Sequence, residues 1–479
     1  MKKKPMSINV ILNGIRTLLS LLFPLITFPY ITRVLSPEGV GQANFSNSII
    51  NYFILLGGLG ITAYAIREGA KKSEQSKEFE RFAGEIWTIS LLAAAFAYVS
   101  LFVALGFVPK LYEYRLLIGI YSVQILTNAI GMEWILNVYE EYRYVTIRSF
   151  LFQLLSLILL FLFVKKAEDV YLYVTVQTIS ASGIGIANYV YVRKRVRLRL
   201  IRGKELLRHM PPILLIFSTT LATTVYVNLD TSMLGFIWGD EQVGYYTVAA
   251  KLYNIVKALI NSIVTVYAVR LSSLYYRERK EYDQTFREIY QIITGLAIPM
   301  AVGGYLLCEE IIVILGGEIY LPASESMILL MFSLIFATVG NLFGAGALLI
   351  VKKESNMFTA TLLGAVINTL LNYILIHEMK CTGAALATLI TEIAVCSLLF
   401  WRAKKWAKIA LPWKHIWKAA AACTLFVPLI RGIQGWELHC GMTVALCIFA
   451  CVPLYVLLLL LLKDEFILNI LEGLKRRKK

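Results

Sequence analysis

Residues 441–462 read GMTVALCIFACVPLYVLLLLLL, and none of these side chains is charged. A bilayer core about 30 Å thick is crossed by a helix of about 20 apolar residues, so this stretch predicts a transmembrane helix. Apolar stretches of similar length recur along the whole chain of 479 residues. Charged residues make up only 16% of the chain, below the roughly 25% of soluble domains. We therefore predict an all-α integral membrane protein.

The apolar stretches predict fourteen transmembrane helices. An even number of crossings places both termini on the same side of the membrane. The predicted spans are 8–32, 42–64, 84–108, 115–138, 146–164, 169–192, 211–238, 243–268, 286–307, 325–350, 357–376, 382–401, 415–431 and 441–462.

Basic residues are concentrated on one side of this predicted topology. Most of the 47 Lys and Arg residues fall on the side of the two termini, with dense clusters at 193–208, 402–408 and 475–479. The positive-inside rule assigns that side to the cytoplasm. The net charge of +16 does not indicate nucleic-acid binding, because that function needs a basic surface on a soluble fold.

A weak internal repeat accompanies the fourteen spans. SPEGVG at 36–41 aligns with GDEQVG at 239–244 after a shift of 203 residues, with Glu, Val and Gly identical in the last four positions. The shift corresponds to six helices, so the halves are predicted to be parallel repeats with a binding site between two lobes. The predicted divisions are an N-terminal lobe at 1–200, a C-terminal lobe at 201–405, and two additional helices with a basic tail at 406–479.

A few ionisable side chains lie inside the predicted spans, where they are costly unless they face protein or water. Asp230 and Lys251 both lie about 12 Å below the outer surface at 1.5 Å per residue, so they could pair. One interpretation is a structural ion pair that keeps both charges in the membrane. The other is a functional pair that opens when a substrate phosphate competes with Asp230 for the lysine. Arg16 and Lys257 have no obvious acidic partner at matching depth, which favours exposure to an anion-attracting cavity. Snorkelling towards the interface is the alternative for Arg16.

Glu392 is the most isolated carboxylate by depth in the predicted topology. A membrane carboxyl that binds and releases a proton is what an ion-coupling site needs, so Glu392 and Asp230 are the coupling candidates. A neutral packing role is the alternative for Glu392.

Asparagine side chains form polar stripes in two predicted spans. Asn44, Asn47 and Asn51 are spaced three and four residues apart and share one helix face, and Asn368 and Asn372 form a similar pair. A polar stripe in the membrane must face protein or water. These residues are therefore either interhelical hydrogen-bonding groups or part of a cavity wall that binds sugar.

Enzyme signatures are absent from the sequence. It contains no Walker loop, no GxSxG and no HExxH, and its Cys residues have no CxxC spacing. We expect neither an enzyme nor a metal or cofactor site. Without an ATP site, transport must be driven by an ion gradient, the membrane potential or downhill substrate flux.

Five separated segments stand out in order along nearly the whole chain. They are PLITFPYITRVLSPEGVG at 24–41, GMEW and EEYRY within 131–144, DTSMLG and VGYYTVAAK within 230–251, INTLLN at 367–372, and TGAALATLITE at 382–392. These segments resemble the Wzx-type polysaccharide biosynthesis flippases. This family belongs to the superfamily that also holds multidrug and toxin extruders and the lipid II flippase.

The resemblance implies transport of an undecaprenyl-diphosphate-linked oligosaccharide to the outer leaflet of a bacterial cytoplasmic membrane, by alternating access around a cationic cavity. The cargo would be an O-antigen, capsule or exopolysaccharide repeat unit, with protons or sodium as coupling ions. The chain would work among membrane lipids as a monomer, with association with glycan polymerase machinery left open. The motif positions carried over are Arg33, Asp230, Lys251, Asn368, Asn372 and Glu392.

Two other functions compete with this one. A multidrug or cation exporter of the same superfamily would have twelve helices and an acidic cavity, whereas basic groups here equal or outnumber acidic ones in the spans. A membrane oligosaccharide polymerase would need a large outer loop, and no predicted outer loop exceeds about 20 residues. Both observations favour the flippase.

Overall fold

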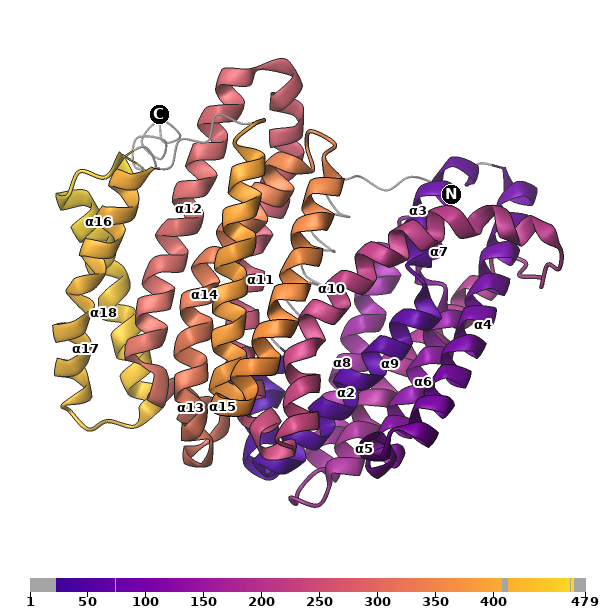
Figure 1. Cartoon of the computed structure of the whole chain (residues 1–479), viewed down its shortest axis with the longest axis horizontal. Helices are drawn as coiled ribbons and strands as arrows, with labels where there is room; N and C mark the ends of the chain where they lie inside the picture. Colours follow the sequence, from indigo (N-terminus) through magenta and orange to yellow (C-terminus); the bar gives the residue numbers. More distant parts are fainter. Residues whose placement is uncertain (1–22, 74, 407–411, 466, 469–479) are drawn as a thin grey trace. The chain divides into compact units, whose positions relative to one another are not determined.

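The computed structural model describes residues 23–73, 75–406, 412–465 and 467–468. Regular secondary structure in these ranges is helical throughout, with no strand (Figure 1). The chain divides into two compact units, Met1–Gly244 and Tyr245–Lys479. The all-α fold class predicted from the sequence is confirmed.

The first unit is a bundle built around α2, which packs against α4, α6 and α10. Residues 23–34 form the helix that precedes it. The further elements are α2 (Pro37–Gly58), α3 (Ile61–Lys72), α4 (Ser76–Phe107), α5 (Pro109–Glu113), α6 (Arg115–Gly131), α7 (Glu133–Val138), α8 (Tyr142–Phe163), α9 (Val170–Arg193), the 3-10 helix η1 (Lys204–His209) and α10 (Met210–Ile237).

The second unit is centred on α14, which packs against α12 and α15. The helix α11 (Asp240–Arg277) begins in the first unit and continues into the second. The remaining elements are α12 (Arg279–Leu306), α13 (Cys308–Gly316), the 3-10 helix η2 (Glu318–Ala323), α14 (Ser324–Phe343), the π-helix η3 (Gly344–Leu348), α15 (Glu354–Ala403), α16 (Trp413–Thr424), α17 (Phe426–Gln434) and α18 (Cys440–Leu461).

Eleven helices in the described ranges are long and apolar enough to span a membrane. One of these, α15, holds two of the predicted spans, because its backbone breaks at Lys380 (φ 53°). The predicted span 115–138 is broken at Met132 (φ 44°) into α6 and α7, neither of which reaches spanning length alone. Each predicted span from 42–64 onward therefore coincides with helical structure. The first predicted span, 8–32, lies mostly outside the described residues.

The stretch 441–462 forms α18 and shows how such a helix is shared between protein and lipid. Its buried side chains recur at every fourth position: Thr443, Cys447, Cys451, Tyr455 and Leu459. This spacing makes one ridge of the helix surface, and ridges of this kind pack into the grooves of a neighbouring helix. Away from the ridge, Phe449 is 84% exposed, which suits a lipid-facing position.

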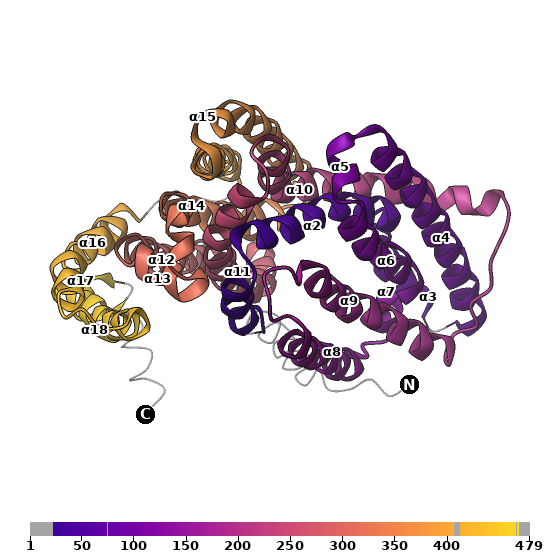
Figure 2. The same cartoon turned by 90° about the horizontal axis from the view of Figure 1, so that it is seen from below.

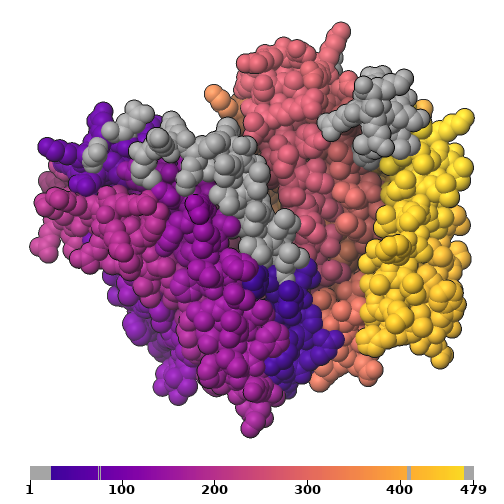
Figure 3. Space-filling model, turned by 180° about the vertical axis from the view of Figure 1, so that it is seen from behind, coloured from indigo at the N-terminus to yellow at the C-terminus, as the bar shows by residue number. Residues whose placement is uncertain are grey.

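The C-terminal helices α16–α18 lie beside α12 and α13 in both ribbon views, and they share a core with them (Figures 1 and 2). Figure 3 shows their surface, in yellow, adjacent to that of α12. Phe426 and Tyr455 belong to this core and pack edge to face. The two helices outside the predicted repeat are thus an integral part of the second unit.

The repeated motif forms a reciprocal crossing at the start of α2 and α11. Ser36 caps α2, its Oγ accepting from the Gly39 amide at 3.2 Å. Gly41 lies against Asp240, such that an added Cβ would be 1.8 Å from the Asp240 carbonyl oxygen. Gly244 lies against Pro37 in the same way, at 2.1 Å from its carbonyl oxygen. The shift of 203 residues converts one contact into the other, which supports the predicted repeat register.

The helix α10, predicted as the first of the C-terminal lobe, is packed within the first unit against α2 and α3. The compact unit thus extends beyond the predicted N-terminal lobe at 1–200. The divisions 1–200, 201–405 and 406–479 describe repeats in the sequence and stay a prediction.

Candidate functional site

A largely buried ion pair joins α11 to the second half of α15. The Lys257 ammonium donates to Glu392 Oε1 at 3.0 Å and to the Tyr253 hydroxyl at 2.9 Å. The side chains of Glu392 and Lys257 are 9% and 27% exposed. Tyr253 precedes Lys257 by one helical turn, and its hydroxyl also lies 3.4 Å from Glu392 Oε1. One anion, one cation and one hydroxyl thus converge inside the second unit.

The expectation that Lys257 and Glu392 lack partners is therefore wrong. Helix depth estimated from sequence says how far along a helix a charge lies, but not which helix faces it. Two opposite charges at similar depth are stabilised by contact, because each alone would have to be desolvated. One turn further along α11, Asn261 accepts from Asn341 of α14 at 3.1 Å and extends the polar surface.

The polar stripe of α2 is used in part for hydrogen bonding between helices. Asn51 donates to Asn228 of α10 at 3.2 Å. Ser232 of α10 bonds with both Ser48 and Tyr52 of α2 at 3.1 Å. The structure thus places Asn51 in the interhelical role that was one of its two predicted alternatives.

The other asparagine candidates do not converge on the ion pair. Asn44 is half-buried and donates to its own helix at the Val40 carbonyl, at 2.8 Å, while Asn47 is half-buried on α2. Asn368 and Asn372 are buried in the first half of α15, where Asn372 donates to Asn368 at 3.0 Å. The break at Lys380 separates these two from Glu392.

The functional roles of the remaining charged candidates stay predictions. Asp230 is buried on α10 in the first unit, and Lys251 lies on α11 in the second, so their pairing stays a prediction. Arg33 is exposed and donates to the Pro29 carbonyl at 2.9 Å. Arg16 lies outside the described residues.

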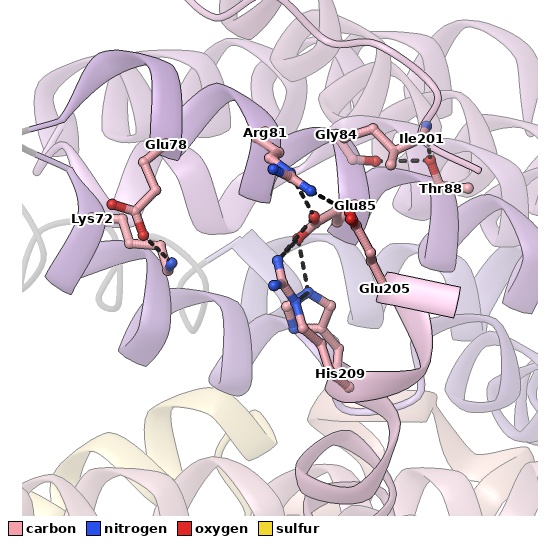
Figure 4. Close-up of polar contacts among 10 residues, drawn as sticks. Lys72, Glu78, Arg81, Gly84, Glu85, Thr88, Ile201, Glu205 and His209 are labelled. Carbon is pink, nitrogen blue, oxygen red and sulfur yellow. Dashed lines mark hydrogen bonds and ion pairs between the residues drawn. The ribbon is translucent and has the colours of Figure 1, made fainter. Parts of the chain in front are cut away.

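Sequence reasoning missed a buried carboxylate, Glu85, near the start of α4. Its side chain is fully buried and accepts from Arg208 at 2.7 and 2.9 Å, and it bonds with His209 Nε2 at 2.9 Å. Figure 4 shows Arg81 and His209 approaching Glu85 from either side. On its other face His209 bonds with the Tyr64 hydroxyl at 2.7 Å. The cluster attaches the basic segment before α10 to the first unit.

Arg148 is a second buried charge that sequence reasoning missed. It lies in the first part of α8, is 4% exposed, and bonds with Asn188 of α9 and with Ser149. Its guanidinium also lies 3.5 Å from Glu133, a span carboxylate without a predicted partner. Glu85 and Arg148 both lie within three residues of the start of a predicted span, at 84–108 and 146–164, where a charged side chain is also consistent with exposure at the membrane interface.

Within the described ranges, no group of three or more His, Cys, Asp or Glu side chains is arranged to hold a metal ion. The Lys257–Glu392 pair is one place where a charge could act on a ligand. A paired lysine can exchange its carboxylate for another anion, which is the chemistry expected of a binding site for a charged headgroup.

The fold is that of a multi-helix membrane transporter. It is similar to the inward-closed lipid II flippase MurJ, with a TM-score of 0.76 and 17% identity over 96% of this chain and 100% of that one. An inward-facing multidrug resistance MATE transporter of the MOP superfamily gives a TM-score of 0.64 and 13% identity, with 83% and 97% of the two chains covered.

The chain belongs to the polysaccharide biosynthesis protein family, whose model matches residues 8–274, more than half of its length. A MatE model matches residues 216–374. Two curated relatives are each named as a proposed O-antigen transporter. The protein from Escherichia coli (strain K12) is 23% identical over 79% of this chain and 92% of its own length. The protein from Shigella dysenteriae is 27% identical over 78% and 94%. The family membership predicted from the motifs is confirmed.

Proposed function

We propose that this protein is a flippase that moves an undecaprenyl-diphosphate-linked oligosaccharide from the cytoplasmic to the outer leaflet of the bacterial cytoplasmic membrane. The family membership and the names of the two curated relatives support a glycan cargo. The observation that carries the proposal is the Lys257–Glu392 pair, a partly exposed cation within the second unit. Both termini are on the cytoplasmic side, as the distribution of basic residues indicates.

Lys257 offsets the cost of taking a diphosphate out of water. A phosphate oxygen is a stronger competitor for an ammonium than a neutral sugar or an amide, because charge-assisted hydrogen bonds are about twice as strong as neutral ones. Binding of the headgroup at Lys257 replaces Glu392 as its counter-charge. The polyprenyl tail stays in lipid, so only the polar part of the cargo needs a path through protein.

The exchange also couples transport to an ion gradient. Once Lys257 turns to the cargo, the Glu392 carboxylate is buried without its cation, and a buried unpaired carboxylate is stabilised by taking up a proton. Release of the cargo restores the ion pair and expels the proton on the side of release, so cargo and proton move in the same direction and a proton gradient directed into the cell slows export. Asn261 and Asn341 lie next to this exchange and offer amide groups to the sugar.

The test reconstitutes the purified protein in liposomes with a fluorescent undecaprenyl-diphosphate oligosaccharide and follows its translocation with and without a proton gradient. The variants are Lys257→Gln, Glu392→Gln and the double change, with the exposed Lys280→Gln as a matched control. The double variant removes both charges, so it avoids the roughly 3–5 kcal/mol cost of leaving one buried charge unpaired. Melting temperatures confirm that each variant is folded.

We expect the wild type and Lys280→Gln to translocate the lipid, and the double variant to be slower by about tenfold or more, as loss of a charge-assisted contact predicts. Glu392→Gln should lose the response to the proton gradient. Equal rates in the wild type and the double variant would refute the role of Lys257. Export of a cationic dye with no movement of lipid-linked sugar would refute the flippase and support the drug-exporter alternative, which the MatE match favours. A response to sodium alone would replace the proton as coupling ion.

A further inference from the structure

A cavity of about 270 Å³ opens in the second unit where α12, α16 and the residues after α18 meet. Arg287 of α12 and two lysines of α16, Lys414 and Lys418, contribute cations to its lining. Asp464 and Glu465, which follow α18, contribute carboxylates. None of these residues belongs to the ion pair proposed to bind the cargo.

The floor of the cavity is a closed polar arrangement. His415 is buried, with Nδ1 3.0 Å from the Asp464 carboxylate and Nε2 3.0 Å from the Gln291 carbonyl. The ring is thus held between a carboxylate and a backbone carbonyl.

The rim carries an excess of positive charge. Arg287 lies 3.4 Å from Glu465, but both side chains are more than half exposed, so this pair is weak. Lys418 donates to the Lys463 carbonyl at 2.8 Å and brings its charge to the end of α18. Lys414 is exposed and forms no ion pair with any described residue. Among the described residues, three cations thus line the open cavity with two carboxylates, Asp464 and Glu465, and Asp464 already bonds with the buried His415.

The surroundings of the cavity are those of a membrane interface. Trp413 and Trp417 lie one turn apart on α16 and are 60% and 72% exposed, and tryptophan is enriched at the level of lipid headgroups. Leu461 and Leu462, at the end of α18 beside the cavity, are 68% and 41% exposed and offer an apolar surface to acyl chains. A soluble anion would use the cations alone, whereas a lipid would use both.

We propose that this cavity binds the phosphate-bearing headgroup of an anionic bilayer phospholipid, with its acyl chains along the exposed end of α18. Basic pockets between helices on the cytoplasmic side are suited to such headgroups. The site places a lipid against the contact between α16 and α12, and so stabilises the C-terminal helices against the rest of the second unit. It is independent of the cargo and of the proposed flippase activity.

The test measures lipid binding to the full-length, delipidated protein by native mass spectrometry, with phosphatidylglycerol and phosphatidylcholine as matched probes and inorganic phosphate as competitor. The variant is Arg287→Gln/Lys414→Gln, which changes only exposed rim residues. The control is Lys77→Gln/Lys280→Gln, which removes two exposed lysines from the same predicted side of the membrane. Melting temperature in phosphatidylcholine nanodiscs verifies folding of all three proteins.

The wild type and the control should prefer phosphatidylglycerol, and the rim variant should lose about fivefold in that preference for each cation removed. Phosphatidylglycerol should also raise the melting temperature of the wild type more than that of the rim variant. An unchanged preference in the rim variant would overturn the site. Displacement of the bound lipid by millimolar inorganic phosphate, with equal stabilisation, would overturn the lipid as its ligand and indicate a free anion.

Discussion

Replacing Gly41 by alanine tests the crossing of α2 and α11. The new methyl carbon would lie 1.8 Å from the Asp240 carbonyl oxygen and 2.5 Å from its carbonyl carbon. Carbon and oxygen normally approach no closer than about 3.3 Å, so the two segments must separate by about 1.5 Å. The clashing atoms are backbone and cannot rotate away. We expect a loss of about 3 kcal/mol, at the upper end of the range for overpacked sites.

The assay is thermal unfolding of the purified protein in one detergent, with Gly58→Ala as the matched control. Gly58 lies on the same helix, and an added Cβ there would meet no atom within 4 Å. The control should melt at or slightly above the wild-type temperature, because alanine favours a helix by up to about 1 kcal/mol over glycine. Equal melting temperatures for Gly41→Ala and Gly58→Ala would refute the close approach.

The reciprocal contact, Gly244 against Pro37, provides a second test of the same crossing. Gly244→Ala would place its methyl carbon 2.1 Å from the Pro37 carbonyl oxygen and should also destabilise the protein. The separation forced by either substitution relieves part of the other clash, so the double variant should lose less than the sum of the two losses. Additive losses would show that the two glycines do not act on one crossing.

Two further predictions concern the clusters outside the candidate site. Glu85→Gln should cost about 1.5–3 kcal/mol, because the buried carboxylate loses charge-assisted bonds to its three basic partners, Arg81, Arg208 and His209. Glu78→Gln at an exposed ion pair should change the melting temperature little, and equal shifts for the two variants would contradict this prediction. Gly383→Ala would place a methyl carbon 2.1 Å from the Leu375 carbonyl oxygen at the break in α15, so we expect the protein to lose about 2–3 kcal/mol of stability. The matched control is Gly303→Ala, where an added methyl carbon meets no atom within 4 Å. A Gly383→Ala protein as stable as this control would show that the bend tolerates the methyl group.

The helical architecture could be predicted from the sequence because a membrane constrains it so strongly. Backbone N–H and C=O groups in lipid must form hydrogen bonds within their own segment. An apolar stretch such as 441–462 is therefore constrained to form a helix. Breaks within helices were harder to predict. Met132 and Lys380 adopt positive φ without glycine or proline, and composition alone gives no sign of this.

The candidate site could be predicted only as a set of residues. An ionisable side chain in a span signals function from sequence because burial is costly, and this reasoning selected Lys257 and Glu392 separately. Their pairing depends on the rotation of α11 and α15 about their own axes, which hydropathy does not report. Glu85 and His209 are 124 residues apart and escaped notice for the same reason.

The sequence by itself determined the class of protein and the family, and it predicted fourteen spans and the register of a repeat, because each follows from local composition or from motifs read along the chain. The tertiary structure alone decided which charges meet and which glycines touch backbone. Gly41 and Asp240 are brought together by the crossing of two helices, and Lys257 finds Glu392 across a helix interface. Such contacts depend on packing between distant segments, where a rotation of one helix changes every partner.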